Sequence, residues 1–334
     1  MRNSNVGILG GGSWGTTVAS LVARNASALL WARNENTVRE INDKHTNSRY
    51  LGETVLSRKL RATSDLHSAV TQADVLVIAI PSHSFRNILN EVQNDVNDSV
   101  PIVSLTKGLE LDTRMRMTEI IQELLPANPR AILTGPNLAR EVIAGYAAAS
   151  VLAMDDQTII SDLQKVFHNR RFRVYTNHDV IGCELGGVLK NIIAIAAGIG
   201  DGLGAGDNAR AAVITRGLAE ISRLGTAMGG EAQTFAGLTG MGDLVATCTS
   251  AQSRNRNVGF ALGAGKTMDE ILADMYMVAE GVISAPTVMA LGKEYNVEMP
   301  IAEEVYEVVR GNRNARDALK GVLKAGIGSE AEPN

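Results

Sequence analysis

Short apolar runs alternate with stretches of helical periodicity through the first half of the chain. Residues 6–9, 27–31, 75–80 and 101–105 form runs of strand length, rich in apolar residues, as buried parallel strands require. Residues 131–133, 147–153 and 172–175 continue the series. An alternation of strands and helices predicts an α/β domain with a doubly wound, mostly parallel sheet.

The pattern changes after about residue 176. Strand-like runs vanish, helical periodicity dominates, and more than half of the 33 glycines lie between Gly182 and Gly265. The segment Asp201 to Arg210 is so rich in glycine that we expect a shaped loop there. We predict two domains, residues 1–178 and a mainly α-helical domain over 179–325, followed by a disordered tail at 326–334.

A glycine motif follows the first predicted strand. Gly10, Gly12 and Gly15 have the spacing G-x-G-x-x-G at a strand-to-helix turn. The first glycine makes the tight turn, the second lets a pyrophosphate approach the backbone, and the third lets helix and strand pack closely. The start of the helix supplies unpaired N–H groups and the positive end of a dipole. The motif therefore predicts a Rossmann-type, dinucleotide-binding domain.

The end of the second predicted strand bears on the choice of cofactor. Sites specific for NAD usually have Asp or Glu there, to hold the ribose 2′-hydroxyl. This chain has Arg33 instead, a cation where the 2′-phosphate of NADP would sit. The residue favours NADP(H), or the use of both NADP(H) and NAD(H); the alternative is a solvated arginine at a strand end.

Composition excludes several classes of function. The net charge is −4, so no global basic field favours nucleic acid or an anionic membrane. The two cysteines, Cys183 and Cys248, lack metal-site spacing, so we expect free thiols, a reducing compartment and no metal. We find no long apolar leader and no run approaching 18 apolar residues, and we therefore predict a soluble, cytoplasmic protein.

Three predicted strands end in polar residues, where open α/β sheets bind their ligands. His83 follows residues 75–80, and a surface or capping role is favoured over acid–base chemistry. Lys107 follows residues 101–105, either facing the crevice or exposed on a loop. Gly135, Pro136 and Asn137 follow residues 131–133 and predict a strand-turn-helix junction with a polar cap.

The helical half holds the strongest candidates for chemistry. Lys190 lies in the segment 184–198, which is apolar nearly all round and therefore predicted to be buried. Burial disfavours the charge of a lysine and suits it to proton transfer; the alternative is a side chain that extends to water. Asp243 is either a helix cap or a functional acid. The segment 253–257, SRNRN, is the densest candidate for binding phosphate.

Several long motifs in the right order resemble the bacterial-type NAD(P)-dependent glycerol-3-phosphate dehydrogenases. They are GGGSWGTTVA, LTKGLE, TGPNLAREV, ELGGVLKNIIAIAAGIGDGLGAGDNARAAVITRGLAE, FAGLTGMGDLVATCTSAQSRNRNVG and VAEGV, and the resemblance runs from Val6 to about Ala315. It implies interconversion of dihydroxyacetone phosphate and sn-glycerol 3-phosphate, which supplies the backbone of phospholipids. It also implies a Rossmann domain followed by a helical domain.

The resemblance also implies roles for individual residues. It implies cofactor contacts, beside the three glycines, from Ser13, Trp14, Arg33, Lys107, Ala139, Arg254, Val278 and Glu280. It implies substrate contacts from Lys107, Gly135, Asn137, Lys190, Asp243, Ser253, Arg254 and Asn255. Lys190 would transfer the proton, with Lys107 close enough to polarise the carbonyl group. Asn137 departs from the usual Ser or Thr, although an amide can still donate a hydrogen bond.

Two alternatives stay open at this point. Another dehydrogenase of the same architecture could act on a β-hydroxyacid or a nucleotide sugar, and a non-catalytic dinucleotide sensor could retain the fold. The SRNRN segment favours a small phosphorylated substrate over the first alternative, and a buried Lys190 argues against the second. The sequence does not determine the oligomeric state, for which a homodimer is one alternative.

Overall fold

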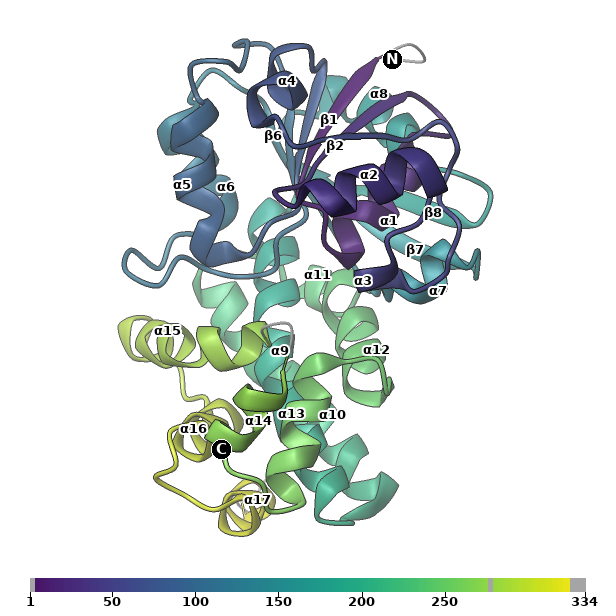
Figure 1. The fold of residues 1–334 in the computed structure, drawn as a ribbon. Helices are drawn as coiled ribbons and strands as arrows, with labels where there is room; N and C mark the ends of the chain where they lie inside the picture. Colours follow the sequence, from purple (N-terminus) through teal and green to yellow (C-terminus); the bar gives the residue numbers. More distant parts are fainter. Residues whose placement is uncertain (1–3, 276–278, 325–334) are drawn as a thin grey trace. The chain divides into compact units, whose positions relative to one another are not determined.

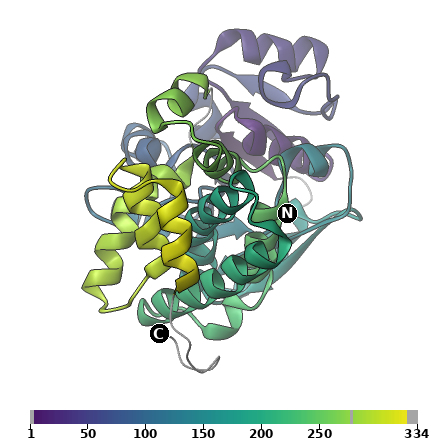
Figure 2. The same ribbon diagram turned by 90° about the horizontal axis from the view of Figure 1, so that it is seen from below.

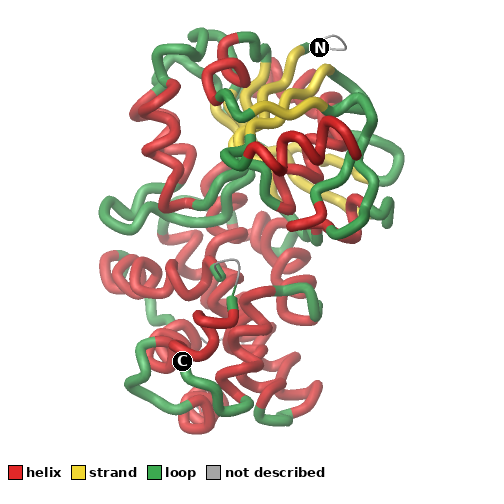
Figure 3. The backbone as a smooth tube through the Cα atoms, viewed as in Figure 1, coloured by secondary structure: helices red, strands yellow, loops and turns green. Residues whose placement is uncertain are grey.

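The computed structural model describes residues 4–275 and 279–324. The chain divides into two compact units, residues 1–180 and 181–334. Figure 3 shows that strands occur in one of these units and that helices and loops make up the other in the described part of the chain.

The first unit is built on one eight-stranded sheet with the order β3-β2-β1-β4-β5-β6-β7-β8. Neighbouring strands are parallel except for β6 and β7, which pair antiparallel. The order of the first six strands is the classical order of dinucleotide-binding folds. The strands are β1 (Asn5–Leu9), β2 (Ser27–Trp31), β3 (Arg61–Thr63), β4 (Val75–Ile78), β5 (Ile102–Ser104), β6 (Arg130–Thr134), β7 (Ala148–Met154) and β8 (Phe172–Asn177).

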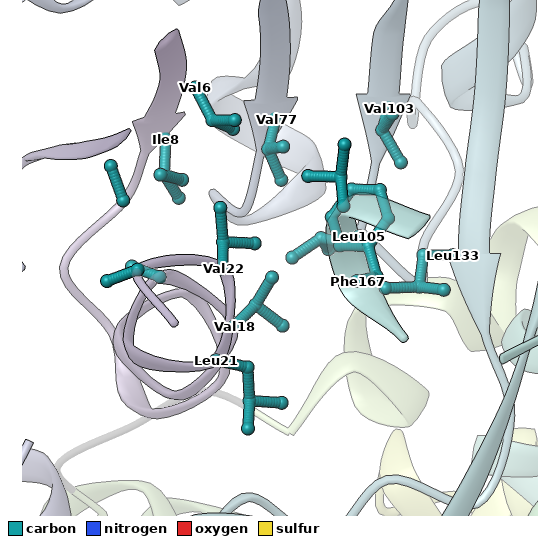
Figure 4. Close-up of a cluster of buried hydrophobic side chains, with 14 of the residues drawn as sticks. Val6, Ile8, Val18, Leu21, Val22, Val77, Val103, Leu105, Leu133 and Phe167 are labelled. Carbon is teal, nitrogen blue, oxygen red and sulfur yellow. The ribbon is translucent and has the colours of Figure 1, made fainter. Parts of the chain in front are cut away.

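Helices cover the sheet of the first unit (Figure 1). The apolar side chains of the strands are buried. In Figure 4, Val6 and Ile8 of β1 lie with Val77 of β4 near Val18 and Val22 of α1, all within one buried cluster. The helices are α1 (Ser13–Val22), α2 (Glu35–Lys44), α3 (Ser48–Leu51), α4 (Leu66–Thr71), α5 (Ser82–Val92), α6 (Met117–Leu124), α7 (Ala139–Ile143) and α8 (Gln157–Phe167).

The predicted doubly wound sheet is confirmed, with one strand that the sequence pattern missed. Strand β3 is only three residues long and carries exposed Arg61, so it lacks the apolar run that marks the other strands. It exists because it pairs with β2, whose Leu30 lies opposite Ala62. A short edge strand of this kind is set by pairing rather than by its own composition.

The described residues of the second unit form helices joined by loops (Figure 2). Its elements are α9 (Val180–Gly202), α10 (Gly206–Ala227), α11 (Ala232–Phe235), the π-helical turn η1 (Leu238–Gly242), α12 (Asp243–Thr249), α13 (Arg254–Gly263), α14 (Met268–Asp274), α15 (Glu280–Glu294), α16 (Pro300–Val309) and α17 (Ala315–Lys324).

Many glycines of this unit permit close packing between helices. A Cβ at Gly198 of α9 would lie 2.0 Å from the carbonyl oxygen of Arg256, and one at Gly259 of α13 would lie 2.0 Å from that of Ile195. Such distances exclude any larger residue. The expectation of a shaped loop over Asp201 to Arg210 is therefore wrong: α9 runs to Gly202 and α10 begins at Gly206.

Helix α9 is the central apolar element of the second unit. By its length and composition, α9 could cross a membrane. However, 94% of its 18-residue apolar stretch is buried inside the protein. The sequence has no uninterrupted run of 18 apolar residues, since Glu184 and Lys190 interrupt this segment, but the mean hydropathy of α9 still reaches that of a membrane span. A buried core helix passes the same test, so this finding is weak support for a membrane span.

Candidate active site

The glycine turn between β1 and α1 has the geometry of a phosphate cradle. Gly10 adopts a φ of +124°, which residues with a side chain rarely adopt, and its N–H binds the carbonyl oxygen of Trp31 at 3.1 Å. A Cβ at Gly12 would meet nothing within 4 Å, so the backbone is open to a ligand there. Helix α1 begins at Ser13 without a side-chain cap or an acidic residue in its first turn, and these features suit a pyrophosphate.

Asn47 supports this turn and was missed by the sequence analysis. Its side chain is fully buried, and its Nδ2 donates to the carbonyl oxygen of Gly11 at 3.0 Å and to Oγ1 of Thr16 at 2.9 Å. The motif gives no signal for it, because Asn47 lies 36 residues from Gly11 and reaches the turn only through the fold.

The other predicted cofactor residues of the first unit surround the glycine turn. Arg33 is exposed two residues beyond β2, and Ala32 next to it lies against Gly11, where a Cβ would approach within 2.6 Å. Trp14 has a buried Nε1 without a hydrogen-bond partner among the described residues. Ala139 begins α7 and lies beside α1, because its carbonyl oxygen accepts from Oγ1 of Thr17 at 3.4 Å.

Lys107 and Gly135 meet at the carboxyl edge of the sheet. Parallel strands β5 and β6 end side by side, and the Nζ of Lys107 donates to the carbonyl oxygen of Gly135 at 2.9 Å. Gly135 has a φ of +132°, and a Cβ there would lie 3.3 Å from the Cα of Ser150. The structure thus joins two residues that the sequence offered separately, and the ammonium lies at the ligand-binding edge of the sheet.

Asn137 is held by Ser150 rather than acting as a helix cap. Oγ of Ser150 donates its single proton to the carbonyl oxygen of Thr134 at 2.7 Å, so it accepts from Nδ2 of Asn137 at 3.0 Å. This orientation leaves the buried Oδ1 without a partner among the described residues. The predicted polar cap is wrong, since α7 has Leu138 at its N-cap and no side-chain cap bond.

In the second unit, Lys190 is buried in a polar cluster. Its side chain is 6% exposed, and Nζ donates to Oδ1 of Asp243 at 2.5 Å and to Oγ1 of Thr247 at 2.7 Å. The alternative of a lysine that extends to water is therefore wrong. Its Nζ therefore lies within hydrogen-bond distance of one carboxylate and one hydroxyl group.

Asp243 owes its position to the turn that precedes it. The π-helical turn η1 packs closely against the end of α11. A Cβ at Gly240 would lie 2.0 Å from the carbonyl oxygen of Phe235. Asp243 is the first residue of α12, after the N-cap residue Gly242, and its carboxylate accepts a hydrogen bond from Lys190. Of the two sequence-based alternatives, this contact supports the functional acid.

Asn255 links three helices of the second unit. Its Nδ2 donates to Oδ1 of Asn191 on α9 at 2.9 Å, and its Oδ1 accepts from the N–H of Gly281 on α15 at 3.0 Å. Lys190 precedes Asn191, and Glu280 precedes Gly281, so this bond chain brings predicted site residues from α9, α13 and α15 together. No sequence motif indicates chemistry at Asn191, Gly281 or Thr247.

The SRNRN segment divides into residues with separate roles. Ser253 caps α13 by accepting from the N–H of Arg256 at 3.2 Å. The guanidinium of Arg256 pairs with buried Asp201, with Nε 2.8 Å from Oδ2, and is therefore engaged within the unit. Arg254 is exposed; neighbouring protein atoms partly desolvate its guanidinium and lower its pKa, an effect that the charge of Glu280 opposes. Arg254 is thus the candidate for an anion.

The remaining predictions concern Val278, the tail, the two cysteines, a metal site and His83. Val278 and the tail from residue 326 lie outside the described residues. Both cysteines are buried free thiols, and burial raises the pKa of Cys248 to about 12. Among the described residues, no group of three or more His, Cys, Asp or Glu side chains could hold a metal ion. His83 is exposed on α5.

The fold and the two groups of side chains define a class of protein, the oxidoreductases that bind a nicotinamide dinucleotide on a Rossmann domain. Comparison with known families narrows the class. Residues 5–160 match the N-terminus, and residues 179–320 the C-terminus, of NAD-dependent glycerol-3-phosphate dehydrogenase. The chain belongs to this family.

Individual relatives agree over nearly the full length. A glycerol-3-phosphate dehydrogenase (NAD(P)+) from Sphingopyxis alaskensis is 61% identical over 98% of both chains. One from Mycobacterium avium is 53% identical over 99% of this chain and 97% of its own. A crystal structure of glycerol-3-phosphate dehydrogenase from Coxiella burnetii superposes with a TM-score of 0.92 at 37% identity, over 97% of this chain and 100% of its own.

Proposed function

We propose that this chain reduces dihydroxyacetone phosphate to sn-glycerol 3-phosphate with NAD(P)H, reversibly, and so supplies the backbone of glycerophospholipids. The observation that carries the proposal is the match of both halves of the chain to both parts of one dehydrogenase family. The residues in the two units supply a dinucleotide cradle, cations for a phosphate and a buried lysine that can transfer a proton.

The cofactor would be held by the glycine turn and its neighbours. The open backbone at Gly12 and the uncapped start of α1 would bind the pyrophosphate, and the unpaired Nε1 of Trp14 offers a donor. We assign further contacts to Gly10, Gly15, Ser13, Arg33, Lys107, Ala139, Arg254, Val278 and Glu280. Arg33 supports a preference for NADP(H), and when bound the cofactor supplies the hydride.

We assign the substrate contacts to two groups of polar residues. Lys107, Gly135 and Asn137 form one group, in which Oδ1 of Asn137 offers a hydroxyl group an acceptor. Ser253, Arg254 and Asn255 form the other, at the start of α13, where an anion is favoured by the helix dipole and by the guanidinium. These cations suit the phosphate of a small phosphorylated substrate.

Lys190 would act as the general acid in the reduction. As hydride adds to the carbonyl carbon, negative charge develops on the carbonyl oxygen, and the ammonium of Lys190 donates the proton that completes the hydroxyl group. Asp243 and Thr247 orient the ammonium and hold it in place. In the reverse direction the neutral amine would accept the same proton.

Other parts of the proposal follow the sequence analysis. We place the domain boundary at residues 178/179 and keep the cytoplasm as the location. The oligomeric state stays open, with a homodimer as one alternative, and sedimentation of the purified protein would decide it.

A substitution of Arg254 tests the phosphate site. Arg254→Lys should raise KM for dihydroxyacetone phosphate by roughly 10- to 100-fold, because an ammonium group cannot form the paired bonds of a guanidinium. Arg256→Lys is the matched control, since Arg256 pairs with Asp201 and should change KM little. Steady-state kinetics with NADPH measures both. Equal effects of the two substitutions, or none from Arg254→Lys, would contradict the assignment.

A further inference from the structure

A single guanidinium in the first unit joins two helices to one loop. Arg86 on α5 donates from Nε to Oε1 of Glu110 at 2.7 Å and from Nη2 to Oε2 of Glu110 at 2.9 Å. The same group donates from Nη1 and Nη2 to Glu123 on α6, at 2.8 and 2.9 Å. Arg86 therefore binds two carboxylates in the paired geometry that makes such bonds strong.

The two carboxylates differ in surroundings. The side chain of Glu110 is 16% exposed and that of Glu123 is 48% exposed. Hydrogen bonds from Arg86 lower the pKa of both glutamates, so both are ionised at neutral pH. Because water screens the Glu123 pair more, the Glu110 pair is the stronger restraint.

Glu110 belongs to the loop that carries Lys107. This loop, residues 105–116, connects β5 to α6 and closes on itself, since the N–H of Glu110 binds the carbonyl oxygen of Met115 at 3.0 Å. Oγ1 of Thr113 also donates to the Glu110 carboxylate. The Arg86 bonds thus hold a folded turn rather than one side chain.

The loop is fixed on both sides of Lys107. Before it, Oγ1 of Thr106 donates to the carbonyl oxygen of Ile80 at 2.7 Å. After it, Glu110 is bound by Arg86. Lys107 thus lies between two hydrogen-bonded residues, Thr106 and Glu110, and its Nζ reaches the carbonyl oxygen of Gly135.

We propose that the pair Arg86–Glu110 is a positioning device for Lys107, which sets where its ammonium meets the substrate and the cofactor. Neither residue contacts the reacting atoms in this proposal. It rests on the proposed function in one respect, the assignment of Lys107 to the site. Glu123 binds the same guanidinium from α6, with no hydrogen bond to the loop in the described part of the chain, so we assign it to stability alone.

The test compares two changes at the same guanidinium. Glu110→Gln removes the charge that holds the loop, and Glu123→Gln removes the charge that holds α6. Displacing a catalytic group by about 1 Å can cost 10²-fold in rate, so Glu110→Gln should lower kcat/KM for dihydroxyacetone phosphate by roughly 10- to 100-fold. Glu123→Gln should stay within about twofold of the parent. Thermal melting records the stability of each variant, and equal kinetic losses in both would overturn the proposal.

A double-mutant cycle asks whether the effect passes through Lys107. In a Lys107→Met background, Glu110→Gln should cost less than about twofold, because the group it positions is gone. A loss as large as in the parent background would overturn the positioning role. If Lys107→Met is as active as the parent, the assignment of Lys107 to the site is wrong, and this inference with it. If Lys107→Met is impaired but Glu110→Gln keeps the kcat/KM of the parent, only the inference is wrong.

Discussion

Arg33 is the residue on which the choice between the two cofactors depends. It is exposed beside the glycine turn, and within the described residues no ion pair involves it. The first residue of α2 is Glu35, which pairs with Arg39 instead. A cation in this position that is not already neutralised can attract a 2′-phosphate, which NADP has and NAD lacks.

Substitution of Arg33 by an acid should reverse this preference. Arg33→Asp should raise KM for NADPH at least about tenfold more than KM for NADH, because a phosphate loses a charged partner and gains repulsion. Arg39→Asp changes the net charge equally from the exposed face of α2 and should leave the ratio of the two KM values unchanged. Equal losses for both cofactors in Arg33→Asp would mean that Arg33 does not read the phosphate.

The burial of individual site residues could be predicted from the sequence, but their partners could not. Burial of Lys190 could be predicted, because its helix is apolar on every face. Its partner could not, because Asp243 lies 53 residues away and is aimed by a π-helical turn that has no simple sequence signature. Asn137 was expected to cap a helix, but its amide is bound by Ser150 from a strand that no local pattern connects to it.

At the scale of elements, a buried carboxylate joins two helices of the second unit. Glu220 on α10 is 1% exposed, and its oxygens accept from the N–H groups of Ile301 and Ala302 at 2.7 and 3.3 Å, at the start of α16. Burial raises the pKa of Glu220 to about 7 from an ordinary value of 4.5, although the two backbone bonds oppose the shift. The native state therefore retains a proton that the unfolded state releases.

This linkage predicts a pH dependence of stability. Between pH 4.5 and 7 the native state binds more protons at Glu220, so the free energy of unfolding should fall as pH rises, by up to about 1.4 kcal/mol per pH unit. Glu220→Gln cannot ionise, and its urea unfolding at pH 5, 6 and 7 should lack this contribution. Glu303→Gln, at an exposed position of α16, should keep it. The same slope in parent and Glu220→Gln would contradict the assignment.

Elements were predictable where one face or the whole element is buried. The strands β1, β2, β4 and β5 showed as apolar runs because parallel strands are covered on both faces. Strand β3 gave no such run, since its pairing with β2 defines it. The end of α9 and the start of α10 were not predicted, because glycine has two roles in this segment. Gly202 permits close helix packing and Gly204 adopts a left-handed turn, and composition does not separate these roles.

At the scale of the whole molecule, the proposed function assigns one part of the chemistry to each unit. The first has the dinucleotide cradle and the Lys107 group, and the second has Lys190 with Asp243 and the start of α13. The change of pattern near residue 176 indicated this division. Motifs spread over nearly the whole chain indicated the family. In the proposed mechanism, Lys190 delivers the proton to the substrate oxygen.

The rate of NADPH-dependent reduction of dihydroxyacetone phosphate by Lys190→Ala tests this claim most directly. General acid–base groups contribute about 10² to 10⁴ in rate, so kcat should fall by that factor while the Kd of NADPH stays near that of the parent. Lys293→Ala, at an exposed lysine of α15, is the control. Circular dichroism shows whether Lys190→Ala is folded. Added alkylamines should restore part of its rate if the rest of the site is intact. A folded Lys190→Ala enzyme that turns over within a few-fold of the parent would contradict the account.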